Sequence, residues 1–209
     1  MNKKKYILAA KNGDAEAQFK LGVMYDKGQG FARDEAEAIR WYWLAADQGH
    51  AKAQFTLGLM YRSGEEATQD KAEALKWYLL AGESGGVFAQ FNIGWIYSRG
   101  DGVAQNIGEA MRWYKLAADQ GFAYAQYHLG VMYANGEGDA QDLSEAIKWF
   151  RLAADQGLVD AQFNLGFMYS EGEGVIQDKA EAATWYRLAA DKGDTRAQFN
   201  LSELIKNKS

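Results

Sequence analysis

The sequence predicts an all-α protein: a solenoid of about twelve helices, built from helical hairpins that repeat along the chain. A triplet of Ala, Gln and an aromatic residue recurs at one constant step without insertion, beginning at Ala17, Ala53, Ala89, Ala125, Ala161 and Ala197. A second motif, Glu-Ala-x-x-Trp-aromatic, keeps the same step from Glu37 to Glu181. The chain has 23 Gly and no Pro, so its turns must be made by glycine.

The first helix of each repeat is predicted from the spacing of its apolar residues. In the first repeat it covers residues 15–26, where Ala17, Leu21 and Met24 fall on one helical face. Gly28 supplies the stop, because glycine accepts the left-handed conformation that often ends a helix. Glycine also recurs inside this helix, where it costs about 1 kcal/mol relative to alanine. We therefore expect close backbone contact with a neighbouring helix at Gly22, Gly58, Gly94, Gly130 and Gly166.

The second helix is predicted to begin near Asp34, whose carboxylate can accept hydrogen bonds from free backbone N–H groups. Glu37 follows three residues later, as in a capping box. Trp41 and Leu44 continue the apolar stripe until Gly49 ends the helix. We expect the Trp and Tyr rings of this helix to fill the space between adjacent hairpins. The same cap recurs at Asp70, Asn106, Asp142 and Asp178.

Both ends of the chain depart from the pattern, as capping segments do. The N-terminal segment matches the end of a second helix, with Lys5 where Trp would stand. The C-terminal segment is a lone first helix in which Ser202 and Glu203 replace the glycine and apolar positions. We predict a single solenoid domain over 1–209, made of an N-terminal half-repeat (1–13), five repeats (14–193) and a C-terminal capping helix (194–209).

The repeated motif reads Ala-x-Ala-Gln-Phe-x-Leu-Gly-x-Met-Tyr, then Gly-x-Gly, then Glu-Ala-x-x-Trp-Tyr-x-x-Ala-Ala and a final Gly. Carried from Ala15 over nearly the whole chain, it resembles the Sel-one-like repeat (SLR), a tetratricopeptide-like helical hairpin. The resemblance implies a right-handed α–α superhelix whose first helices line the concave side. It also implies a non-enzymatic adaptor or scaffold, often bacterial, that binds a protein or peptide. Where the family often has Pro before the second helix, this chain has Ala104, Ala140 or Ile176.

The composition argues against several function classes. A net charge of −5 disfavours a nucleic-acid partner. With no Cys and two His, the chain lacks disulfides, thiolate metal sites, cysteine nucleophiles and multi-histidine centres. We therefore expect no catalytic residue, no metal and no cofactor.

The sequence also lacks the features of a membrane protein. No apolar run approaches the roughly 20 residues of a membrane span. The apolar stretch that follows the N-terminal lysines, residues 6–10, is too short for a signal peptide. We expect a monomer without membrane insertion, located in the cytoplasm, or in the periplasm or outside the cell if a signal was removed.

Candidate partner-binding residues emerge when the repeats are compared with one another. The positions equivalent to Glu16, Lys20, Val23 and Lys27 vary, and their spacing places them on one face of the first helix. We call these positions the first-helix stripe. Its middle part carries aromatic and amide side chains suited to binding a peptide or protein segment, which we expect to lie from Phe88 to Phe167. The candidates are Phe88, Asn92, Trp95, Arg99, Tyr124, His128, Val131, Asn164 and Phe167.

Several alternatives stay open at this point. Trp95 and Phe167 could instead pack against neighbouring first helices. Trp43 and Leu79 on the second helices could form an apolar interface or simply pack locally. The resemblance also admits an immunity protein that neutralises a secreted toxin such as a lipase effector. Some cysteine-rich relatives suggest a cell-wall or β-lactam-binding enzyme, although this chain lacks their cysteines. The insertion-free period also fits a recently duplicated or engineered array.

Overall fold

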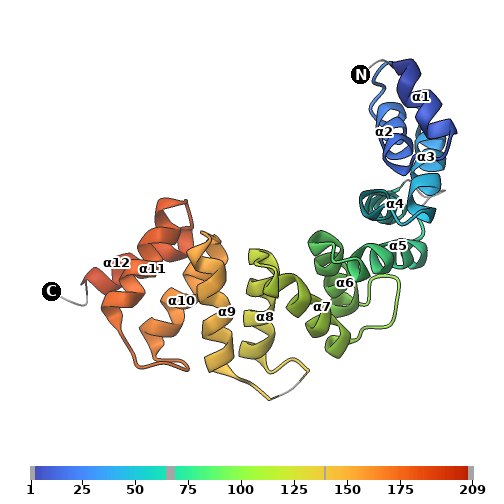
Figure 1. Cartoon of the computed structure of the whole chain (residues 1–209). Helices are drawn as coiled ribbons and strands as arrows, with labels where there is room; N and C mark the ends of the chain where they lie inside the picture. The colour runs from blue at the N-terminus through green and yellow to red at the C-terminus, as the bar shows by residue number, and fades with distance from the viewer. Residues whose placement is uncertain (1–2, 65–68, 139, 207–209) are drawn as a thin grey trace. The chain divides into compact units, whose positions relative to one another are not determined.

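The predicted helices are present in the structure, a computed structural model that describes residues 3–64, 69–138 and 140–206. These residues contain no strand, so the all-α prediction is confirmed. Figure 1 shows the helices in chain order: α1 (Lys3–Lys11), α2 (Ala15–Asp26), α3 (Glu35–Asp47), α4 (Ala51–Ser63), α5 (Lys71–Glu83), α6 (Val87–Arg99), α7 (Ile107–Asp119), α8 (Ala123–Asn135), α9 (Leu143–Asp155), α10 (Val159–Glu171), α11 (Lys179–Asp191) and α12 (Thr195–Lys206).

The helices fall into two compact units. Unit 1, Met1–Gln105, contains α1 to α6, and unit 2, Asn106–Ser209, contains α7 to α12. Within each unit every helix packs against the next one in the sequence. The most extensive contacts join the first and second helices of one repeat, as in α2 with α3 and α8 with α9. The hairpin is therefore confirmed as the building block, while the single continuous domain, with its two capping segments, stays a prediction.

Side-chain caps begin the second helices where the sequence predicts them. The carboxylate of Asp34 accepts a hydrogen bond from the N–H of Glu37 at 3.0 Å. Equivalent bonds are made by Asp70, Asn106, Asp142 and Asp178.

The other half of the predicted capping box is wrong. The N–H of Asp34 donates to the carbonyl of Tyr25, and Glu37 pairs with Arg40. The main-chain bond from Asp34 to Tyr25 instead ties the start of α3 to α2, which helps to close the hairpin.

The mid-helix glycines make room for an aromatic ring of the second helix. A Cβ atom at Gly166 would meet Cδ1 of Tyr186 at 2.6 Å, closer than carbon atoms normally approach. The predicted close approach is thus present. We expected the backbone of a neighbouring helix at this point, but the approaching group is mainly an aromatic ring. The same relation joins Gly22 with Tyr42, Gly58 with Tyr78 and Gly130 with Phe150.

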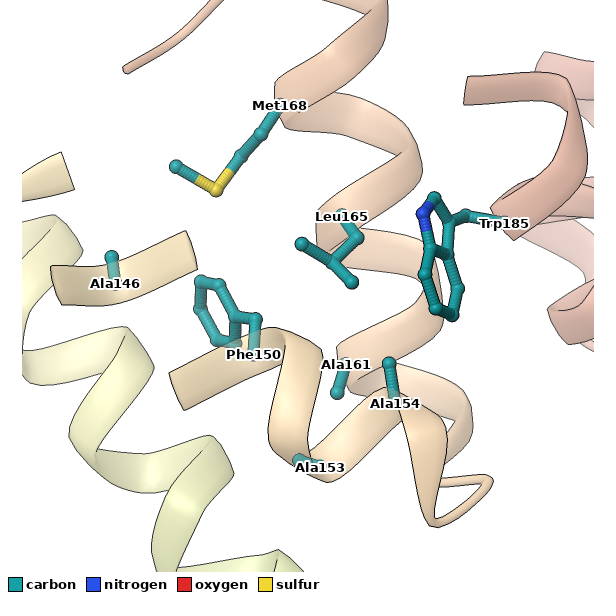
Figure 2. Packing of buried hydrophobic residues seen from close by; sticks show 8 residues of the cluster. All are labelled: Ala146, Phe150, Ala153, Ala154, Ala161, Leu165, Met168 and Trp185. Carbon is teal, nitrogen blue, oxygen red and sulfur yellow. The ribbon is translucent and has the colours of Figure 1, made fainter. Parts of the chain in front are cut away.

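The core continues from one repeat to the next through the tryptophans. Figure 2 shows the cluster in unit 2, where Trp185 of α11 packs with residues of α9 and α10. Its members are Ala146, Phe150, Ala153, Ala154, Ala161, Leu165, Met168 and Trp185. In unit 1, Trp77 of α5 likewise clusters with buried residues of α3 and α4. The prediction that these rings fill the space between adjacent hairpins is therefore confirmed within each unit.

A buried glutamine links each first helix to the second helix before it. Gln126, only 4% exposed, donates from Nε2 to the carbonyl of Ala118 at 3.1 Å. Gln18, Gln54, Gln90 and Gln162 donate in the same way to residues eight positions earlier. Each of these carbonyls also accepts a main-chain bond, as Ala118 does from the N–H of Gly121, so the glutamine uses the second lone pair of the oxygen and satisfies its own buried donor. This explains why Gln recurs beside the core Ala of every repeat.

The acceptor oxygen of the same glutamine is satisfied unequally. Gln48 donates to Oε1 of Gln18 at 2.7 Å, and Gln156 donates to Oε1 of Gln126 at 2.8 Å. Within the described part of the chain, Oε1 of Gln54 is buried without a partner. The residue equivalent to Gln48 in that repeat is Ser84, whose short side chain bonds back to its own helix at the Leu80 carbonyl.

Replacing Ser84 with glutamine is therefore expected to stabilise the protein. Ser84→Gln should raise the free energy of unfolding by about 0.5–1.5 kcal/mol, because it supplies a donor to the buried oxygen of Gln54. Urea denaturation followed by circular dichroism measures the change. The matched control is the reverse exchange, Gln48→Ser, which should lower stability by a similar amount. A destabilised Ser84→Gln variant would contradict the assignment.

Candidate protein-binding face

The first-helix stripe is accessible in both units and separate from the core. Phe88, Arg99, Tyr124 and Phe167 are exposed, and the other five candidates are half-buried. The apolar positions on the other side of these helices are closed, since Leu57, Ile93, Leu129 and Leu165 are at most 1% exposed. Substitutions at the four exposed positions are therefore less constrained by the core than substitutions at the half-buried ones, of which Val131 packs against the core cluster of unit 2.

In unit 1, the first helices α2, α4 and α6 line an apolar pocket of about 350 Å³. Each contributes one phenylalanine: Phe19, Phe55 and Phe88. The ring centroids of Phe55 and Phe88 lie 6.3 Å apart, and Phe88 is 57% exposed. Lys52 and Thr56 of α4 also line the pocket. The pocket thus offers solvent an apolar floor with a cationic side chain beside it.

A second cluster in unit 1 is built around Trp95. The guanidinium of Arg62 on α4 lies over the Trp95 ring at 4.1 Å, and that of Arg99 lies at 5.3 Å. Arg62 also donates to Oδ1 of Asn92 at 2.9 Å, while Nδ2 of Asn92 donates to the carbonyl of Phe88 at 2.7 Å. Trp95 and Asn92 therefore serve packing within the unit as well as presenting half-exposed surface.

Asp101 lies between two cations, Lys71 and Arg62 of this cluster. Its carboxylate lies 2.6 Å from Nζ of Lys71 and 3.6 Å from Nε of Arg62. Nearby, burial raises the pKa of Tyr78 to about 12, and the positive charge of Arg62 opposes that rise. The phenol is therefore neutral at physiological pH, and the local charge comes from the arginines, Lys71 and Asp101.

In unit 2, the structure brings three candidates together. Val131, Asn164 and Phe167 line one pocket of about 220 Å³ between α8 and α10. Phe167 also borders a second pocket of about 430 Å³, which it shares with Phe199 and Asn200 of α12. With 40% of its surface exposed, Phe167 separates two hollows on one face.

The other two candidates of unit 2 lie outside the linings of these pockets. Tyr124 is 53% exposed, with its ring centroid 5.7 Å from that of Phe122. The His128 imidazole stacks in parallel on Tyr114 at 5.1 Å and meets Tyr127 edge-on at 5.5 Å. His128 is thus half-buried between aromatic rings of its own unit.

Sequence comparison missed Arg62, Phe19 and Phe55. The phenylalanines belong to the recurring triplet, so nothing distinguishes them from core residues in the sequence. Arg62 lies one position before a stripe position, where the five full repeats have Asp26, Arg62, Ser98, Ala134 and Ser170. A cation found in only one full repeat was a detectable signal.

The apolar spot considered on the second helices packs locally. The indole of Trp43 meets Trp77 edge-on at 4.7 Å, and its Nε1 donates to the hydroxyl of Tyr61 at 3.1 Å. Leu79 is half-buried. These contacts favour the packing interpretation of this spot.

Across 3–64, 69–138 and 140–206, no group of three His, Asp or Glu side chains is placed to hold a metal ion. Among the helices of that same part of the chain, none has the length and apolar character needed to cross a bilayer.

A family model for the Sel1 repeat matches the chain five times in succession, over residues 15–50, 51–86, 87–122, 123–158 and 159–194. The chain belongs to the Sel1 repeat family. The resemblance inferred from the motif is thereby confirmed, with repeat boundaries one residue from those we predicted. Sel1 repeat proteins generally mediate protein–protein interactions. The sequence has no significant match among curated proteins.

Solved structures of other Sel1 repeat proteins resemble this one. A protective antigen present in uropathogenic Escherichia coli strains, which displays an SLR fold, is 38% identical with a TM-score of 0.91. The match covers 98% of this chain but 44% of that one, so this chain spans less than half of its length. A Sel1 repeat protein from Oxalobacter formigenes is 35% identical with a TM-score of 0.77, covering 92% of this chain and 78% of that one.

A more distant match is an immunity protein from Pseudomonas aeruginosa. It is 22% identical with a TM-score of 0.51, and the match covers 89% of this chain and 71% of that one. This degree of likeness shows a shared fold alone.

Proposed function

We propose that this Sel1 repeat protein is a non-enzymatic scaffold that binds a protein or peptide partner through its first-helix stripe. The observation that carries the proposal is the set of exposed aromatic rings beside apolar pockets: Phe88 in unit 1 and Phe167 in unit 2. Of the remaining candidates, Val131 and Asn164 line a pocket beside Phe167, and Asn92 bonds to the carbonyl of Phe88.

The physical basis is the cost of leaving such rings in water. A large aromatic side chain buries much apolar area while losing little conformational entropy, so a few of them can supply most of the binding energy. Among the apolar side chains on the stripe of unit 1, Phe88 is the most exposed. Its neighbours Phe19 and Phe55 form a preformed receptor for an apolar side chain, which reduces the ordering cost of binding.

An immunity role is supported only by a shared fold at low sequence identity. We keep it as the alternative, in which the partner is a secreted toxin. A toxin-neutralising protein would use the same face to hold a folded effector. Protection of a strain that produces the toxin, lost with the variant described below, would identify that role. Hydrolysis of a cell-wall or β-lactam substrate by the purified chain would instead support the enzyme alternative.

Affinity capture from the source organism tests the proposal. The baits are the wild-type chain, Phe88→Ala combined with Phe167→Ala, and a matched control, Leu80→Ala combined with Leu152→Ala. The control removes apolar residues from second helices with exposures of 44% and 47%, comparable with that of Phe167. We expect the stripe variant to capture at least about tenfold less partner, corresponding to about 1.4 kcal/mol or more. Equal capture by the stripe variant, together with loss in the control, would place binding on the other face.

A further inference from the structure

The stripe of unit 1 carries an excess of positive charge. Its positions include four cations and one carboxylate: Lys20, Lys27, Lys52, Arg99 and Glu16. Glu16 is already paired, with Nζ of Lys20 at 2.8 Å and Nε2 of His50 at 3.0 Å. In the part of the chain that the structure describes, neither Lys52 nor Arg99 has a carboxylate within ion-pair distance. Lys52 and Arg99 are therefore available to an external anion.

These cations flank apolar surface and do not form a uniform basic patch. Lys52 lines the pocket formed by Phe19, Phe55 and Phe88. Arg99 lies at the other end of α6 from Phe88, eleven residues away, which corresponds to about 16 Å along the helix axis. About five residues of extended chain cover this distance. The surface thus offers an apolar pocket with one cation at its side and another a short segment away.

The second cation is held ready for binding. Arg99 and Arg62 both lie against the ring of Trp95, and Arg62 is further fixed by Asn92 and Asp101. A guanidinium that rests on an aromatic ring keeps its hydrogen-bond donors and loses less conformational freedom when it meets a carboxylate.

The positive face is a local feature. Unit 1 contains thirteen basic and thirteen acidic residues, whereas unit 2 contains ten basic and fifteen acidic residues. The stripe of unit 2 has three carboxylates, Asp160, Glu171 and Glu203, and one cation, Arg196. Arg196 pairs with Asp160 and Asp194. A neutral unit with a few cations around an apolar pocket suits a short acidic protein segment better than a nucleic-acid backbone, which requires a broader basic surface.

We propose that the unit 1 face binds an acidic segment of a partner protein through an apolar anchor. A bulky apolar side chain of the partner enters the pocket between Phe19, Phe55 and Phe88. One carboxylate beside the anchor pairs with Lys52, and a second, about five residues along, pairs with Arg99. This inference rests on the proposed function and adds the chemistry of the partner. Opposite charges on the two surfaces would also speed association and select the correct partner.

Fluorescence anisotropy with the full chain and labelled synthetic peptides tests this chemistry. The reference peptide is acidic with one central leucine, and its variants replace the leucine with alanine, the acids with their amides, or the acids with lysine. We expect the reference peptide to bind, each replacement to weaken binding by about tenfold or more, and added salt to weaken it further. No binding of the reference peptide, or equal binding of the amide or lysine peptides, overturns the inference. Labelled single-stranded DNA that binds as tightly as the reference peptide also overturns it.

Protein variants locate the effect. Lys52→Glu and Arg99→Glu should each lower the affinity for the reference peptide by about tenfold. The matched control is Arg40→Glu, which reverses an exposed cation on the second helix α3 and should leave affinity within about twofold. Circular dichroism verifies that each variant is folded. Equal weakening by all three variants would show a non-specific charge effect and overturn the inference.

The same variants distinguish failure of the acidic-segment inference from failure of the proposed scaffold function. Lys52→Glu and Arg99→Glu are used as capture baits beside the Phe88→Ala and Phe167→Ala double variant. A partner lost only with the double variant overturns the acidic chemistry and leaves the proposed function in place. A partner retained by every variant overturns both.

Discussion

Gly166→Ala is expected to lower the free energy of unfolding by about 1–3 kcal/mol, although alanine is the better helix former. The new methyl group would lie 2.6 Å from Cδ1 and 3.0 Å from Cγ of Tyr186. That ring is 1% exposed and its hydroxyl accepts a hydrogen bond from Asn200 at 3.1 Å, so moving it away from the added methyl group would disturb buried packing and this bond. The gain in helix propensity, about 1 kcal/mol, is smaller than the cost of this overlap.

Gly108→Ala is the matched control, since Gly108 also lies within a helix of unit 2. The nearest atom to its added Cβ is Oδ1 of Asn106 at 3.6 Å, an ordinary contact. Here we expect a gain in stability of up to about 1 kcal/mol. Chemical denaturation of both variants measures the two effects. Opposite signs of the two changes support the packing of the Tyr186 ring against Gly166, and a Gly166→Ala variant as stable as the wild type would contradict it.

Trp185→Ala is expected to cost about 3–5 kcal/mol. The indole is 8% exposed and packs in one cluster with Leu165 and Ala154, so its removal opens a cavity between two repeats (Figure 2). Its Nε1 also donates to Glu181 at 2.9 Å. Trp185→Phe keeps part of the ring and should fall between the wild type and the alanine variant.

Trp43→Ala provides the comparison for this effect. Trp43 is 39% exposed and contacts mainly Trp77 and Tyr61 at the surface of unit 1. Its loss should cost less than about 2 kcal/mol. Thermal and urea denaturation of the three variants give the ranking, and equal losses at Trp43 and Trp185 would show that burial does not determine the cost.

Core and stripe are occupied by different positions of the same helices. In α10, Ala161 and Leu165 are fully buried whereas Asp160 and Phe167 are exposed. A substitution at an exposed stripe position such as Phe167 therefore changes what the surface offers to a partner and leaves the buried positions Ala161 and Leu165 unchanged. This separation allows a repetitive scaffold to acquire different binding surfaces.

The sequence was sufficient for the helices, their ends and their grouping into hairpins. The apolar spacing, the Asp and Asn caps and the terminal glycines all act within a few residues, and their effects depend on local geometry that the chain carries with it. The constant period then placed every repeat, and of the nine candidates taken from the variable positions of the first helix, four are exposed and five are half-buried.

Other features depend on residues about thirty positions apart, and only the tertiary structure decided them. These features follow from how the first helices of successive repeats lie beside one another. They are the contact of Arg62 with the Trp95 ring, the pocket shared by Phe19, Phe55 and Phe88, and the grouping of Val131 with Phe167. Neighbouring helices are positioned by interlocking side chains such as Tyr186 against Gly166. A periodic pattern specifies which face of a helix is apolar, but the packing of those faces determines which surface residues meet.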